Sequence, residues 1–351
     1  MLSKFLFTSN AVLPIVITIA VGYALKTLGV LPKNFFPLLN KLSFRCCLPC
    51  LLFYNVYNVQ NIGDIASYGG IVLFVIISIL VFYALGFLIS ILTTDDPRQK
   101  GVLLQASYRS NYAIIGISLA TSLCTDGNQE PVVIASILSS ISIPIFNVLA
   151  TIALTIFVED DGKEKKAFAK TAASILKKIC TNPLILGVAA GIATLVIRSF
   201  IPERIEKCAD GTEISEKVFT IKSSVPFLYS TLKSLATAAS TIALIALGGN
   251  FEFNAVGRLK KQIITGTFVR VVLCPAVCLL AAYKAGFRSL EFPALIALYG
   301  TPIAVSSVPM AAEMGNDAEL AGQLVVWTTI ASAFTLFVTI FICSSVGIFS
   351  V

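Results

Sequence analysis

The sequence predicts an all-α integral membrane protein, with ten transmembrane helices in two inverted five-helix repeats. Three observations lead to this fold class. The 351-residue chain is 56% hydrophobic, with a mean hydropathy of +0.88. Only 13% of its residues are charged, against roughly 25% in soluble domains. Finally, the second half of the chain repeats sequence patterns of the first half.

The composition excludes several functional classes. Histidine is absent, so the chain has no imidazole for a zinc site, a haem ligand or a catalytic triad, and we expect no metal and no cofactor. The chain carries a formal charge of +7. In so apolar a chain this charge indicates a lipid bilayer as the partner and not a nucleic acid. Most of the nine cysteines lie in apolar spans, and a bridge between Cys124 and Cys208 is left open.

Ten stretches are long and apolar enough to cross the hydrocarbon layer, which takes about 20 residues. The first shows no small-residue cleavage site and is interpreted as a helix, not a signal peptide. The predicted spans are 11–29, 35–59, 67–93, 101–124, 131–158, 172–199, 225–251, 262–286, 292–314 and 320–348.

Loop charges predict the orientation. Loops after the odd-numbered spans hold twelve Lys and Arg residues, and the opposite side holds eight. Since basic residues collect on the cytoplasmic side, this bias places both termini outside the cytoplasm. The sequence leaves open whether the membrane is the plasma membrane or the endoplasmic reticulum.

Spans one and six share the same spacing between a proline and a glycine. Pro14 and Gly22 in the first are separated by seven residues, as are Pro183 and Gly191 in the second. Because five spans separate the two copies, the second half enters the membrane from the opposite side. The predicted units are a first repeat at 1–158, a short cytoplasmic connector at 159–171 and a second repeat at 172–351.

Spans four and nine also correspond, and both contain helix-breaking sequences. Arg109-Ser110-Asn111 lies near the middle of span four, and Gly300-Thr301-Pro302 near the middle of span nine. A proline within a helix removes a backbone hydrogen bond, and interrupted spans in matching positions point to a transporter's binding site. The alternative is that the prolines only kink structural helices. The predicted helix-break residues are Asn111, Gly116, Pro302 and Pro309.

The charged residues near mid-span are all basic: Arg45, Arg109, Lys233 and Arg270. A charge in the bilayer costs at least ~2.5–3.5 kcal/mol, so each one needs an explanation. For three of them we favour snorkelling or pairing within the bundle, whereas Arg109 adjoins the predicted break. Because no Asp or Glu is central, an organic anion is the favoured substrate. The predicted substrate-binding residues are Arg109, Ser110, Asn111, Tyr112, Thr301, Pro302 and Ile303.

Three motifs resemble the auxin efflux carrier family, which includes the PIN-FORMED and PIN-LIKES carriers and bacterial malate-permease-like proteins. Asn111-Tyr-Ala-Ile-Ile-Gly-Ile-Ser-Leu is similar to the family's Asn-Thr-x-x-x-Gly-Ile-Pro-Leu, with Ser118 in place of the proline. Asn182-Pro183 resembles the start of span six. Residues 301–321 resemble the proline-rich span nine and its Ala-x-Glu-x-Gly-x-Asp-x-Glu-Leu-Ala tail.

The resemblance implies that spans four and nine unwind and cross at the midplane, with Asn111 and Pro302 as crossover residues. It also implies a homodimer in which spans one, two, six and seven form a scaffold while the other spans move as an elevator. The long cytoplasmic loop of the large plant carriers is missing here.

We therefore expect a secondary transporter that moves a small organic anion, auxin-like or malate-like, by alternating access. The competing hypothesis is a non-transporting membrane sensor or scaffold built on the same fold. An intramembrane enzyme is disfavoured, because the chain lacks paired intramembrane aspartates, a Ser–His dyad and a zinc helix.

Overall fold

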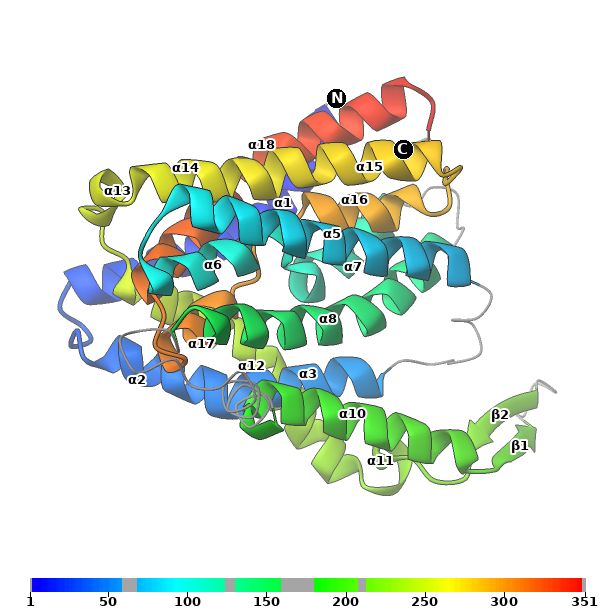
Figure 1. Cartoon of the computed structure of the whole chain (residues 1–351). Coiled ribbons are helices and arrows are strands. Elements are labelled where there is room, and N and C mark those ends of the chain that lie inside the picture. Colours follow the sequence, from blue (N-terminus) through cyan, green and yellow to red (C-terminus); the bar gives the residue numbers. More distant parts are fainter. Residues whose placement is uncertain (1, 59–67, 124–129, 159–179, 208–212, 349–351) are drawn as a thin grey trace, which may run out of the picture.

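A computed structural model describes residues 2–58, 68–123, 130–158, 180–207 and 213–348. The described chain is almost entirely helical (Figure 1). Seven helices in this part are long and apolar enough to cross a membrane, which confirms a multi-pass integral membrane protein. They are Phe35–Tyr57 (α2, η1 and α3), Gly69–Thr93 (α5), Glu130–Ile156 (α8), Pro183–Phe200 (α10), Pro226–Asn250 (α12), Lys260–Lys284 (α14, η4 and α15) and Ala318–Ser345 (α18).

The other described helices are the long helix α1 (Leu2–Thr27) and several shorter ones. The shorter helices are α6 (Pro97–Tyr108), η2 (Tyr112–Gly116), α7 (Ile117–Ser122), α11 (Ile221–Ser224), α13 (Ala255–Arg258), α16 (Phe292–Gly300) and α17 (Ser307–Glu313). Among the described residues, three segments are π-helical: η1 (Ser43–Cys47), η2 and η4 (Val269–Leu273).

One polar connector adds a pair of strands to the helical fold. Residues 203–222 include an antiparallel hairpin of β1 (Glu203–Lys207) and β2 (Glu213–Lys217). Glu203 pairs with Lys217, and the Val218 N–H donates to the Pro202 carbonyl just beyond the strands. Pairing satisfies backbone groups that a single extended segment leaves open, so a polar connector can form strands without a core. Figure 1 shows the hairpin projecting beyond the end of α10.

Two helix pairs pack with their backbones unusually close. On α1, a Cβ atom at Gly22 would lie 2.2 Å from the Ile245 carbonyl oxygen of α12. On α10, a Cβ atom at Gly191 would lie 2.8 Å from the Val56 Cβ atom of α3. Small residues permit such approaches between membrane helices. Gly22 and Gly191, which follow a proline at the same spacing in the sequence, therefore have the same role in packing.

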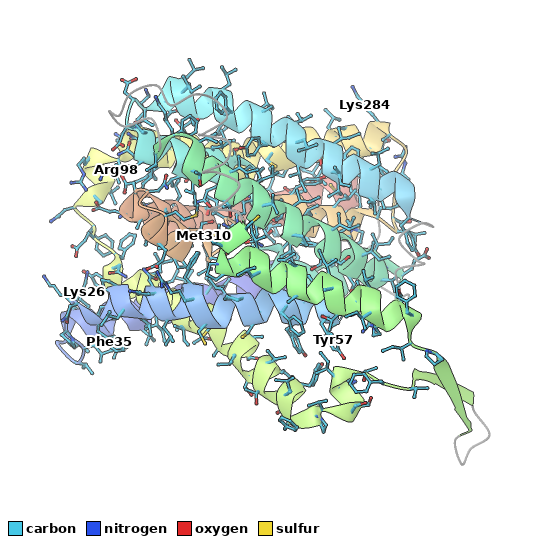
Figure 2. The ribbon with its side chains drawn as sticks, turned by 60° about the horizontal axis from the view of Figure 1, so that its bottom comes forward. Lys26, Phe35, Tyr57, Arg98, Lys284 and Met310 are labelled. Atoms are coloured by element: carbon cyan, nitrogen blue, oxygen red, sulfur yellow. The ribbon has the colours of Figure 1, made fainter. Side chains whose placement is uncertain are left out.

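The polar and apolar residues are distributed as a bilayer requires. Exposed apolar side chains cover α5, α10 and α15, where lipid replaces water as the neighbour. In Figure 2 the labelled charged residues Lys26, Arg98 and Lys284 lie at the margins, and Met310 lies near the centre. The interior around Met310 also contains buried polar side chains, which lie on the interrupted helices α6 and α17 and on the continuous helices α8 and α18.

Some predicted features lie outside the described residues. They are the connector at 159–171 and both members of the candidate Cys124–Cys208 bridge.

Candidate functional site

Two broken helices cross in the interior. Helix α6 ends at Tyr108 and the chain resumes as η2 and α7; helix α16 ends at Gly300 and resumes as α17. The extended segments between these halves run antiparallel and form a bridge between Ser110 and Ile303. The Asn111 N–H donates to the Pro302 carbonyl at 2.8 Å. The two predicted crossover residues are thus hydrogen-bonded to each other.

The sequence explains why α16 ends at this point. Thr301 has extended backbone angles, φ −71° and ψ 151°, as expected for a residue before proline. Pro302 has no N–H with which to continue the helix. Arg109 takes a similar conformation at the end of α6, φ −80° and ψ 118°, without a proline to impose it. The break in span four is therefore maintained by its pairing with span nine.

Two of the predicted helix-break residues do not lie at a break. Gly116 keeps helical angles, φ −61° and ψ −51°, where η2 passes into α7. Pro309 lies in the first turn of α17, where a missing N–H leaves no helical hydrogen bond unmade. Between Pro97 and Ser122 and between Phe292 and Glu313, which are all described, the chain leaves the helix at 109–111 and at 301–306. Gly116 and Pro309 lie beyond those segments.

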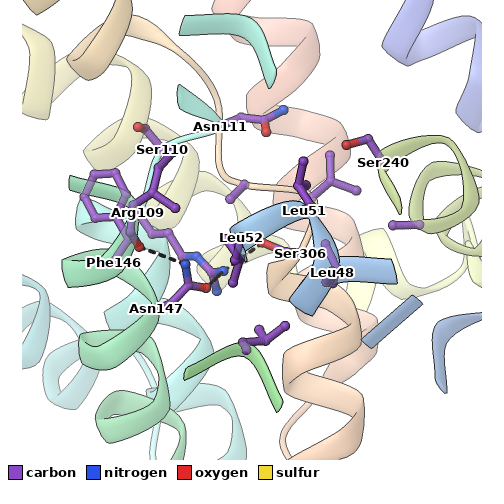
Figure 3. Close-up of a pocket in the computed structure, with 15 residues that line it drawn as sticks. Leu48, Leu51, Leu52, Arg109, Ser110, Asn111, Phe146, Asn147, Ser240 and Ser306 are labelled. Atoms are coloured by element: carbon purple, nitrogen blue, oxygen red, sulfur yellow. Dashed lines mark hydrogen bonds between the residues drawn. The ribbon is translucent and has the colours of Figure 1, made fainter. Parts of the chain in front are cut away.

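Arg109 extends from the break into a buried polar cluster (Figure 3). Its Nη1 donates to Gln105 Oε1 at 3.2 Å and to Met310 Sδ at 2.8 Å. Its Nη2 donates to Asn147 Oδ1 at 2.9 Å and to Ser306 Oγ at 2.7 Å. All four acceptors are neutral, and among the described residues no carboxylate forms an ion pair with Arg109. The guanidinium is held in place while its positive charge is not neutralised.

A cavity of about 40 Å³ lies beside this cluster, room for roughly three water molecules. One side is formed by the crossing and α8, the other by α3, α10 and α12. No carboxylate is among the described residues that line it. The lining residues are Leu48, Leu51, Leu52, Arg109, Ser110, Asn111, Ile143, Phe146, Asn147, Leu184, Ser240, Ala243, Ala304, Val305 and Ser306.

Three of the seven predicted binding residues line this cavity: Arg109, Ser110 and Asn111. The Ser110 hydroxyl and the Asn111 side-chain amide nitrogen are buried and have no hydrogen-bond partner among the described residues. A ligand in the cavity could provide one. The crossing thus presents a fixed cation next to two uncommitted polar groups.

The other four predicted binding residues lie elsewhere. The Tyr112 hydroxyl donates to the Ala135 carbonyl of α8 at 3.1 Å. Thr301 and Ile303 are fully buried in the crossing, and the Ile303 N–H donates to Thr328 Oγ1. Pro302 contributes its carbonyl to Asn111. All four shape the crossing without lining the cavity.

Asn147 and Ser240 line the cavity but were not predicted from the sequence. Asn147 is buried on α8, where its side-chain oxygen accepts from Arg109 and its nitrogen donates to the Ile143 carbonyl. A single amide in the apolar stretch 143–154 is the signal that could have identified it. Ser240 has no such signal, because α12 contains many hydroxyl side chains.

Arg270 neither snorkels nor pairs with an acid. It is completely buried on η4 and donates to backbone carbonyls at the ends of both α6 and α16. The other basic residues differ: Arg45 pairs with Glu313 at 3.2 Å, and Lys233 lies exposed on α12. Arg270 is therefore a part of the crossing, where we had expected snorkelling or pairing within the bundle. Its backbone acceptors are the carbonyls of Tyr108, Leu298, Tyr299 and Thr301.

Comparison with known proteins decides the family. A family model described as "Membrane transport protein" matches residues 7–340, nearly the whole chain. The chain belongs to this family. Its motifs had indicated the auxin efflux carriers, and this match confirms that resemblance. No curated protein sequence matches the chain significantly.

A solved structure supports the fold of this membrane transport protein. The sodium proton antiporter MjNhaP1 from Methanocaldococcus jannaschii, at pH 8, is similar with a TM-score of 0.54. The match covers 97% of each chain at 13% sequence identity. At that identity the likeness concerns the fold alone. Membership of the family supports membrane transport as the general function.

Proposed function

We propose that this membrane transport protein carries a small organic anion across the bilayer by alternating access. The observation on which the proposal depends is Arg109, a buried guanidinium beside a cavity, with neutral hydrogen-bond partners and no acidic partner among the described residues. A buried charge without a counter-ion is costly. A carboxylate in the cavity would remove that cost and would also bond to Ser110 and Asn111.

We further propose ten transmembrane helices in two inverted repeats. The packing supports this, because span one contacts span seven through Gly22 just as span six contacts span two through Gly191. The crossing supports it too, because the broken helix α6–α7 of the first half pairs with the broken helix α16–α17 of the second half through matching extended segments. In this arrangement the termini lie outside the cytoplasm, as the loop charges predict.

An elevator motion accounts for the position of the cavity. It lies between α3, α10 and α12 on one side and the crossing with α8 on the other. About 40 Å³ is too small for an aromatic acid or a dicarboxylate, so substrate entry requires the two sides to separate. Displacement of the crossing relative to α3, α10 and α12 would open the cavity to one face at a time.

A homodimer would cover the polar face of α12. Hydroxyl side chains and one lysine are exposed along this helix within the proposed span, where lipid is a poor neighbour. They line an open groove formed by Ser230, Lys233, Ser234, Thr237 and Thr241, together with Ala238 and Ile242. Cross-linking of a Thr237→Cys variant in membranes tests this, and a species that stays monomeric contradicts it.

Transport of an anion out of a negative interior needs no coupled ion, since the membrane potential contributes ~2.3 kcal/mol per charge per 100 mV. The cavity supports this mode, because none of the described residues that line it can exchange a proton near neutral pH. We therefore propose a uniporter driven by the potential.

The decisive experiment is uptake of radiolabelled carboxylic acids into proteoliposomes, after a thermal-shift screen of acids against matched amides. The expected result is saturable uptake that Arg109→Ala abolishes and Arg109→Lys partly retains. Arg258→Ala is the control, because Arg258 is exposed and pairs with Glu319 outside the cavity.

Unchanged uptake in Arg109→Ala would overturn the proposed role of that residue. Ligand binding without any transport would instead favour a sensor built on the transporter fold.

A further inference from the structure

Arg270 makes contacts that the proposed transport function does not explain. Its guanidinium is completely buried and lies on the side of the crossing where α6 and α16 both end. Nη2 donates to the carbonyls of Leu298, Tyr299 and Thr301 at 3.1, 3.2 and 2.9 Å. Nε donates to Thr301 at 3.1 Å, and Nη1 reaches the Tyr108 carbonyl at 3.4 Å. One side chain therefore contacts the carboxyl ends of both half-helices.

These carbonyls lack their usual donors. In a continuous helix the Leu298 carbonyl would accept from residue 302, which is Pro302 and has no N–H. The Tyr299 carbonyl would accept from Ile303, whose N–H donates instead to Thr328 Oγ1. Arg270 replaces both missing donors. The broken end of α16 is thus satisfied by a side chain from η4.

The contact also changes the local charge. The carboxyl end of a helix carries roughly half a negative charge, so two such ends amount to about −1. The Arg270 guanidinium contributes +1 at the same place. With these contributions balanced, Arg109 remains as the charged side chain next to the cavity, whose described lining also includes Ser110, Asn111 and Ala304 of the same extended segments.

We propose that Arg270 determines the charge selectivity of the site. It neutralises the two helix ends so that the positive charge of Arg109 can attract an anion. Without Arg270, the uncompensated carboxyl ends would offset part of the positive charge of Arg109, and the site would distinguish an acid from its amide less well. Arg270 is a positioning and selectivity residue that does not itself contact the cavity. The inference rests on the proposed anion transport.

The test compares the affinity of the purified protein for a carboxylic acid and for its matched amide, by thermal shift against ligand concentration. Arg270→Met and Arg270→Gln remove the charge, and glutamine keeps an N–H donor for the carbonyls. Arg270→Lys keeps the charge. We expect the acid-to-amide affinity ratio to fall about tenfold in both neutral variants and to stay within about threefold in Arg270→Lys.

The control is Arg288→Met. Arg288 donates to the Tyr283 and Phe287 carbonyls near the end of α15, but it is exposed and lies before the start of α16, at the opposite end of that helix from the crossing. Its loss should leave the ratio unchanged. A purely structural role for Arg270 predicts lower stability in all three Arg270 variants with an unaltered ratio, and that result overturns the proposal.

The outcomes separate the two proposals. If the native protein prefers the acid and the neutral variants do too, the inference about Arg270 is wrong while anion transport stands. If the native protein shows no preference, anion transport is wrong and the inference falls with it. Should neither neutral variant fold, Arg270→Lys decides: a retained ratio with native-like stability supports the role of charge, and a lost ratio, or a retained ratio with lower stability, refutes it.

Discussion

Replacing Gly22 by alanine tests the close packing of α1 on α12. The new Cβ atom would lie 2.2 Å from the Ile245 carbonyl oxygen and 2.9 Å from two further backbone atoms of that residue. Because these are backbone atoms of a helix, no side-chain rotation relieves the clash. Normal contact distances of about 3.5 Å require the helices to separate by roughly 1 Å. Overpacking of this kind costs about 1–3 kcal/mol.

The measurement is the apparent melting temperature of purified protein in detergent, read from tryptophan or thiol-reactive fluorescence. A loss of 1–3 kcal/mol corresponds to a decrease of roughly 2–10 °C. Gly70→Ala is the matched control, because Gly70 lies in the first turn of α5 with no heavy atom within 4 Å of its added Cβ. The same chemical change there should leave stability unchanged or raise it by about 0.4–1 kcal/mol.

Gly191→Ala provides an intermediate case. Its added Cβ would lie 2.8 Å from the Val56 Cβ atom and 3.2 Å from the Phe53 carbonyl oxygen, so the approach is less close than the 2.2 Å at Gly22. We expect the order of stability Gly70→Ala, then Gly191→Ala, then Gly22→Ala. The reasoning is refuted if Gly22→Ala melts at the same temperature as Gly70→Ala.

Two further predictions concern the site, and a third concerns the Arg45–Glu313 ion pair outside it. Asn147→Leu removes an acceptor 2.9 Å from Arg109 and should raise the KM for the anion about tenfold, measured by uptake; an unchanged KM contradicts the assigned contact. Transport of a sulfonate, ionised throughout, should vary less than twofold between pH 6 and 8, since none of the described cavity residues titrates there; a steep profile would reveal a proton-coupled group. A double-mutant cycle on Arg45 and Glu313 should give a coupling of at most about 1 kcal/mol, because the Arg45 side chain is 62% exposed; a much larger value would show that the pair is desolvated in the membrane.

Local patterns predicted the interruption of the helices well. The break at Pro302 could be predicted from the chemistry of proline. Asn111 could be identified because it occupies the position in span four that corresponds to Pro302 in span nine. Gly116 and Pro309, which were also predicted as breaks, lie within helical segments. Residue type shows where a helix can end, but its position relative to the helix start decides whether it does end, and that position was not visible.

Partners across the bundle were harder to predict. Arg109 is distinguished by its adjacency to the break, but its contacts with Asn147, Ser306 and Met310 depend on how α8 and α17 pack. Arg270 has no sequence signal that separates it from a snorkelling arginine. Its importance arises only because η4 lies beside carbonyls that have lost their donors.

The hydrogen-bonded crossing has a genetic consequence. Ser110 and Ile303 belong to different halves of the chain, yet their backbones form one bridge, next to the bond from Asn111 to Pro302. A substitution that displaces one extended segment displaces the other by the same amount. Second-site suppressors of a defective Ser110 or Asn111 allele should therefore be found at 301–304, far away in the gene, and a selection for restored growth or uptake would recover them as paired mutations.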